Sequence, residues 1–178
     1  LAIGSIGATN PARVRLRSMI AEGPQRGGKP LHRALLFPRD PVEPQTPTAF
    51  DFASWPDYDP VDAAQLPDGR VLILLRRVEY ALPARFDTAI AIADPSAIRP
   101  GKPWRGRIIQ RLSGGVFADN FEGIAFVPDA SNPSRGAVWV IADDNFSVFQ
   151  RSVLARFDWN PKAGLLPANE KAPGNPDA

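Results

Sequence analysis

Two short acidic segments carry most of the groups that could do chemistry in this chain of 178 residues. The first segment contains Asp119, Asn120 and Glu122, and the second contains Asp143, Asp144 and Asn145. Carboxylate and amide oxygens that gather without histidine or cysteine are the ligands that hard cations prefer, and calcium is the leading candidate. We therefore predict that all six residues bind the cation and that the four carboxylates among them also act in catalysis.

Three arginines could complement these acidic groups. We expect Arg76, Arg77 and Arg151 to bind substrate, because a planar guanidinium can hold two oxygens of a phosphate group through parallel hydrogen bonds. A bound metal would neutralise the charge of a phosphate ester and polarise a water molecule toward attack. Together, the two kinds of residue could hold a hard cation and an anionic substrate such as a phosphate ester.

A structural interpretation of the same residues stays open. Aspartate and asparagine before a strand often cap turns by accepting hydrogen bonds from backbone N–H groups. An arginine that begins a strand, such as Arg151, can simply pair with neighbouring carboxylates. The acidic loops would then hold a non-catalytic protein together instead of acting on a substrate.

The composition excludes several other kinds of site. The chain has no cysteine, which rules out disulfides, thiolate nucleophiles and cysteine-type zinc sites. Its one histidine, His32, lies among glycines and prolines and is not expected to act. Ser113 precedes two glycines, but the chain has no G-x-S-x-G elbow, so a serine nucleophile is not expected.

Neither nucleic acid nor a membrane span is expected. The net charge of +2 gives no concentrated positive field, and most aromatic residues lie in apolar runs or beside acidic residues. The longest apolar run, residues 71–75, is far shorter than the roughly 20 residues of a membrane-spanning helix. This run instead predicts a buried strand.

The elements that must position these groups are mainly strands. The chain has 20 prolines and 14 glycines, which leave little room for long helices, and short apolar runs recur between them. One helical turn is expected at residues 94–98, where Asp94 can cap the turn and Pro95 fits its first position. The predicted strands are residues 14–20, 34–37, 63–66, 71–77, 88–93, 107–112, 123–127, 137–142 and 152–159.

An internal repeat indicates the architecture. Residues 59–69 resemble residues 119–129, and the alignment pairs Asp62 with Glu122 and places a one-residue slip before the Pro-Asp turn. Each copy contains an acidic loop, an inner strand, the turn and further strands, which is typical of one four-stranded propeller blade. We therefore expect an all-β fold, a partial β-propeller of about two to three blades over residues 1–160, with a flexible tail at residues 161–178.

These motifs resemble the phytase-like family, which is named for an esterase-like activity of phytase. The resemblance rests on residues 62–77, 119–125, 138–146 and 150–157, and it covers roughly residues 35–159. It implies a β-propeller hydrolase of a phosphate ester or related ester, in the periplasm or outside the cell. Because family members are longer, it also implies that the remaining blades or a companion chain complete the propeller. The alternative is a non-catalytic propeller that binds a ligand or a partner protein.

Overall fold

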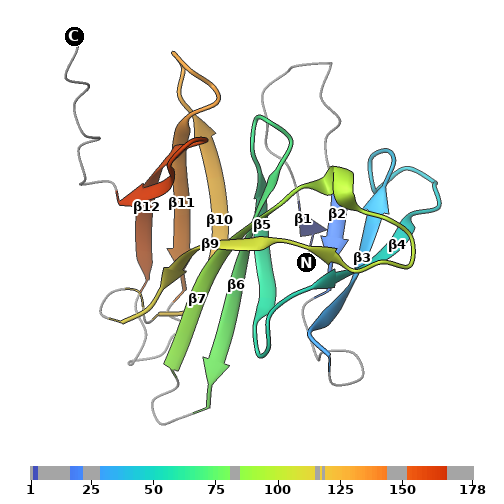
Figure 1. Cartoon of the computed structure of the whole chain (residues 1–178), viewed down its shortest axis with the longest axis horizontal. Helices are drawn as coiled ribbons and strands as arrows, with labels where there is room; N and C mark the ends of the chain where they lie inside the picture. Colours follow the sequence, from blue (N-terminus) through green and yellow to red (C-terminus); the bar gives the residue numbers. More distant parts are fainter. Residues whose placement is uncertain are drawn as a thin grey trace.

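Three β-sheets lie side by side in the computed structural model (Figure 1). The structure describes residues 2–3, 17–21, 29–80, 85–114, 117, 119–143 and 152–167. In spatial order, the first sheet contains β1 (Ala2–Ile3), β2 (Arg17–Ile20), β3 (Leu31–Phe37), β4 (Thr48–Ala53) and β8 (Trp104–Arg105). The second contains β5 (Asp59–Gln65), β6 (Val71–Glu79), β7 (Arg85–Ala93) and β9 (Arg107–Leu112). The third contains β10 (Phe121–Pro128), β11 (Gly136–Ala142), β12 (Val153–Asn160) and β13 (Gly164–Pro167).

The pairing of the strands confirms the predicted all-β fold. Neighbouring strands are antiparallel throughout the second and third sheets, and only the β4–β8 pair of the described residues is parallel. In both of these sheets the strands follow one another in chain order from β5 and β10. The three sheets are therefore consistent with blades of a partial β-propeller.

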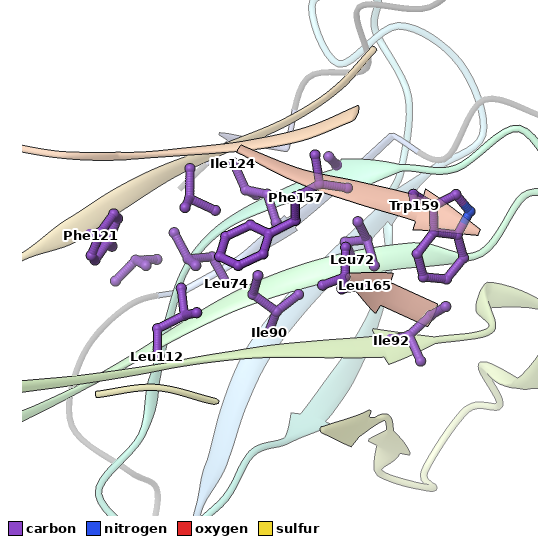
Figure 2. Packing of buried hydrophobic residues seen from close by; sticks show 14 of the residues in the cluster. Leu72, Leu74, Ile90, Ile92, Leu112, Phe121, Ile124, Phe157, Trp159 and Leu165 are labelled. Atoms are coloured by element: carbon purple, nitrogen blue, oxygen red, sulfur yellow. The ribbon is translucent and has the colours of Figure 1, made fainter. Parts of the chain in front are cut away.

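The second sheet is buried on both faces, which explains the continuous apolar run of β6. Val71, Ile73 and Leu75 belong to the hydrophobic cluster shared with the first sheet. Leu72 and Leu74 belong to the cluster shared with the third sheet. Because successive side chains of a strand point to opposite faces, one run of five apolar residues supplies both clusters. Figure 2 shows the cluster between the second and third sheets, in which Leu72 and Leu74 lie near Phe157.

A crossing segment ties the first sheet to the second. After β7, the chain forms a single 3₁₀ turn at Pro95–Ala97, capped by the Asp94 side chain as predicted. It then reaches the edge of the first sheet as β8 before returning as β9 (Figure 1). Trp104 of β8 is buried, with its ring 5.8 Å from that of Phe50 and 5.7 Å from that of Phe52. Burial of this large aromatic ring anchors the crossing segment.

The third sheet extends farther along the chain than the sequence predicts. We expected the folded part to end at residue 160, but Gly164–Pro167 forms β13 and pairs with β12. Leu165 is buried in the cluster between the second and third sheets. The burial of Leu165 holds the strand on the sheet despite the glycine and proline at its ends. The rest of the predicted tail, residues 168–178, lies outside the described residues.

No helix among the described residues is long and apolar enough to cross a membrane.

Candidate functional site

The inner strands of the second and third sheets share the same irregularity. The register of β5 against β6 shifts between Pro60 and Asp62, and the register of β10 against β11 shifts between Phe121 and Gly123. Each shift is a β-bulge of one extra residue, which bends the strand locally. Superposing the bulges matches Val61 with Glu122 and Asp62 with Gly123. The sequence alignment that paired Asp62 with Glu122 is therefore wrong by one residue, because the offset that matches the bulges also matches Pro67 with Pro128 and needs no slip before the turn.

The Asp62 carboxylate joins the two inner strands. Its Oδ2 accepts a hydrogen bond from the backbone N–H of Ile124 in β10 at 2.8 Å. Its Oδ1 accepts another from the N–H of Ala63 at 2.8 Å. The side chain of Asp62 is half-buried, and this burial raises its pKa, while the two backbone hydrogen bonds act in the opposite direction. Sequence reasoning did not single out this residue as a link between sheets.

The raised pKa of Asp62 predicts a pH-dependent stability. Because the folded protein binds this proton more tightly than the unfolded chain, stability should fall as pH rises from the ordinary carboxyl pKa through the raised one. Asp62→Asn should remove this part of the slope, although its NH₂ group faces a backbone donor and lowers stability at every pH. Urea unfolding between pH 4 and pH 7 measures the effect.

The matched control for this test is Asp129→Asn, at an exposed turn between β10 and β11. This variant should keep the wild-type slope between pH 4 and pH 7. A wild-type slope in Asp62→Asn as well would show that Asp62 does not contribute to it.

Arg76 of β6 connects the second sheet to the acidic loop before β10. Its Nη1 donates to Asn120 Oδ1 at 2.5 Å and to Glu122 Oε1 at 2.8 Å. Asn120 Nδ2 also donates to Glu122 Oε1, at 2.7 Å, so the three side chains form one hydrogen-bonded cluster. We call Arg76, Asn120 and Glu122 the rim cluster. The Arg76 side chain is 17% exposed and that of Glu122 is 42% exposed, so the cluster is sheltered on one side and open on the other.

The rim cluster shows that the two inner strands begin at the same end of the molecule. Asp59, the first residue of β5, lies directly opposite Arg76 of β6 in the sheet. The same Arg76 reaches the residues that begin β10. The backbone N–H of Asp143, directly after β11, donates to the carbonyl of Asn120 at 3.2 Å. Residues 119–122 and Asp143 therefore lie together at this rim.

The predicted carboxylates differ in their surroundings. Asp119 is buried, and its carbonyl accepts a hydrogen bond from the N–H of Phe121 at 3.0 Å. Glu122 and Asp143 are exposed. The burial of Asp119 makes it suited to positioning the loop, whereas Glu122 and Asp143 can meet a solute from solvent. Asp144, Asn145 and Arg151 lie outside the described residues.

Arg76 and Arg77 do not lie together, although both are predicted to bind substrate. They are successive residues of β6, so their side chains point to opposite faces of the second sheet. Arg76 faces the third sheet. Arg77 pairs with Asp87 of β7, and its guanidinium lies 5.5 Å from the ring centroid of Tyr58. One phosphate group on the rim cluster would therefore contact Arg76 and not Arg77.

The described residues do not by themselves form a calcium cage. Calcium takes six to eight oxygen ligands, whereas no group of three or more acidic or histidine side chains in the described part of the chain could hold a metal. Asn120 Oδ1 and Glu122 Oε1 already accept hydrogen bonds from the Arg76 guanidinium, a cation that competes for the same oxygens. The predicted site would depend on Asp144 and Asn145, so calcium binding stays a prediction.

His32 lies between the first two sheets. It is buried, its Nε2 has no hydrogen-bond partner, and this atom is 3.8 Å from Asp59 Oδ1. This distance is too long for a direct hydrogen bond. Among the described residues, no hydrogen bond or ion pair joins His32 to the rim cluster.

One comparison with known proteins identifies the family. Residues 8–146, more than half of the chain, match the family described as Phytase-like, esterase-like activity of phytase. No curated protein and no solved structure matches the chain. The matched segment includes Arg76, the bulge of β5 and the whole acidic loop before β10. The chain therefore belongs to the phytase-like family.

Proposed function

We propose that this chain carries the substrate-binding rim of a hydrolase that cleaves a phosphate ester or a related ester. The observation that supports this proposal is the rim cluster, in which an arginine of one sheet lies against an amide and a carboxylate of the next. A fixed guanidinium beside an exposed carboxylate combines an anion-binding group with a potential general base. Membership of the phytase-like family supports the same kind of chemistry.

The roles follow from the exposure and position of each group. Arg76 would bind the ester oxygens and stabilise the negative charge that grows on them in the transition state. Glu122, which is exposed and lies against Arg76, would orient a water molecule and accept its proton. Asp143 would assist from the neighbouring loop, and the buried Asp119 would hold this loop in place. We propose the same kind of assisting role for Asp144.

Whether the proposed activity requires calcium is a question for measurement. The described oxygens do not fit the ion alone, so no step of the reaction is assigned to it. A calcium ion bound with the help of Asp144 and Asn145 would have to displace Arg76 from Glu122 or share the carboxylate with it. Removal of calcium with a chelator from the full-length protein measures this dependence directly.

A second candidate function has its own supporting observation. Asn120 is buried, and the three members of the rim cluster satisfy one another across two sheets, which is what a structural tie requires. In this case the protein is a non-catalytic propeller that binds a ligand or a partner, and the acidic loop stabilises the contact between sheets. Fold alone does not separate the two functions.

Hydrolysis of p-nitrophenyl phosphate and p-nitrophenyl acetate by the full-length protein tests the proposal. We expect turnover of at least one ester, with kcat lowered about 10²-fold or more by Glu122→Gln because the general base is lost. Asp143→Asn should lower kcat by a smaller factor. Both side chains are exposed, so the melting temperature should change little.

The control variant is Glu43→Gln, at an exposed glutamate beside the first sheet, which should leave turnover unchanged. Wild-type turnover in Glu122→Gln would contradict the catalytic role. A melting temperature that falls in step with kcat would favour the non-catalytic alternative.

We further propose that the remaining blades of a longer protein, or a companion chain, cover the outer face of the third sheet. Ile141 of β11 and Leu154 of β12 are Cα partners, and they are 52% and 63% exposed on the face turned away from the second sheet. The intact mass and N-terminal sequence of the natural protein would reveal such a partner, and a lone chain of 178 residues would count against it.

Location in the periplasm or outside the cell is also proposed, and cell fractionation tests it.

A further inference from the structure

Two arginines converge on one buried tyrosine on the side of the second sheet that faces the first sheet. Arg77 of β6 and Arg111 of β9 share this face, because Leu75 and Ala89 of the same face belong to the cluster packed against the first sheet. Their guanidinium carbons lie 5.5 Å and 5.7 Å from the ring centroid of Tyr58. This group lies across β6 from the rim cluster and is separate from it.

Tyr58 is held in place by the turn that precedes β5. Its N–H donates to the carbonyl of Trp55 at 3.1 Å, and its own carbonyl accepts a hydrogen bond from the buried Ser54 hydroxyl at 2.7 Å. Within the described residues, Asp57 of this turn is the only residue other than glycine with a positive φ, at 64°. Such backbone conformations are uncommon, and they cluster at binding sites where the surrounding structure maintains them. The turn thus presents a buried, fixed phenol to the two guanidinium groups.

Arg111 and Tyr58 keep hydrogen-bond donors that no carboxylate of the described residues accepts. Arg111 Nη1 donates to the Tyr58 hydroxyl at 3.0 Å, so this oxygen acts as an acceptor and its own proton can be donated elsewhere. Arg77 pairs with Asp87, and Asp57 also lies close enough for its charge to act on Arg77. By contrast, no carboxylate in the described part of the chain pairs with Arg111, although its side chain carries five N–H donors.

We propose that Tyr58 and Arg111, with Arg77 beside them, bind a phosphate group. The Arg111 guanidinium can hold two phosphate oxygens in parallel, and the Tyr58 hydroxyl can donate to a third. Arg77 is paired with Asp87 and also lies near Asp57, so the anion would be held mainly by Arg111 and the Tyr58 hydroxyl. The site can take free phosphate or the phosphate group of an ester. Its existence does not depend on the proposed hydrolysis, because binding at equilibrium requires no turnover.

Titration of the full chain with inorganic phosphate by calorimetry tests this site, with sodium chloride keeping the ionic strength constant. The titrations are made in the Arg76→Gln background, which removes the guanidinium of the rim cluster from the measurement. We expect saturable binding, weakened at least tenfold by Arg111→Gln and several-fold by Tyr58→Phe. Arg107→Gln, at an exposed arginine on the same strand β9, is the matched control and should bind phosphate unchanged.

Equal titrations for Arg76→Gln and Arg76→Gln/Arg111→Gln would overturn the site, as would an equal loss in the Arg107 control. Arg111 is exposed, so its replacement should leave the fold intact. If Arg111→Gln lowers the melting temperature and no phosphate binds to either protein, the two arginines only cover the tyrosine ring. The same titration with p-nitrophenyl phosphate shows whether the site prefers the free anion or an ester.

Discussion

Replacing Arg76 by glutamine should lower kcat/KM for the hydrolysed ester by about 10²- to 10³-fold, the usual loss when one donor to a developing oxyanion is removed. The guanidinium of Arg76 is the one positive charge that contacts both Asn120 and Glu122 in the described structure. Without it, the ester oxygens lose their donor and Glu122 loses one of the two groups that orient it. Steady-state kinetics of the full-length protein with p-nitrophenyl phosphate measure the change.

Arg76→Lys separates charge from geometry in this experiment. A lysine keeps the charge but cannot hold Asn120 and Glu122 with one planar group, so we expect only partial recovery of kcat/KM. Arg107→Gln, which removes an exposed arginine from β9, should have no effect. Equal kinetics for wild type and Arg76→Gln would remove Arg76 from the site.

Replacing Phe121 by alanine should lower the free energy of unfolding by about 3–5 kcal/mol, the range for large aromatic residues in a packed core. Phe121 has no exposed surface and belongs to the cluster between the second and third sheets (Figure 2). Its ring lies 6.3 Å from that of Phe117. The residue directly follows Asn120, so its loss should also loosen the rim cluster. Guanidinium unfolding measures the change.

Tyr80→Ala is the control, because Tyr80 is 95% exposed after the end of β6 and should contribute less than about 0.5 kcal/mol. A change of the same size at both positions would mean that the cluster around Phe121 is not a packed core. Retention of wild-type catalysis in Phe121→Ala would show that the rim cluster does not depend on this core.

Strands with strong apolar patterns were predictable from the sequence. The bounds of β9 agree with the prediction, and β6, β7, β11 and β12 differ from it by a few residues at most. In these strands, apolar residues either alternate with polar ones, as in a strand buried on one face, or form a continuous run, as in a strand buried on both faces. The capping of one helical turn by Asp94 was equally readable, because a proline follows the capping residue.

Shorter strands were missed for physical reasons that differ from one to the next. β4 begins directly after a proline-rich stretch, which hid the alternation of Phe50 and Phe52 with polar or small residues. β8 has two residues and exists because the buried Trp104 draws the crossing segment to the first sheet. β13 depends on Leu165 packing against a core built by other sheets. Such tertiary causes leave little local signal.

The candidate site was predictable in its composition but not in its connections. The structure places Asp143 beside the acidic loop, because its N–H donates to the carbonyl of Asn120. The separation of Arg76 from Arg77 follows from the two-residue period of a strand and could have been inferred once β6 was assigned. The contact of Arg76 with Asn120 and the link from Asp62 to Ile124 could not, because they join sheets whose relative placement the sequence leaves open.

A double-mutant cycle on Arg76 and Glu122 in the full-length protein tests the rim cluster most directly. The four proteins are wild type, Arg76→Gln, Glu122→Gln and the double variant, and kcat/KM for p-nitrophenyl phosphate is measured for each. If the two side chains act as one unit, the second substitution should cost far less activity in the presence of the first. Effects that add to within about 0.5 kcal/mol, or full activity in the double variant, would contradict a functional site at this contact between two sheets.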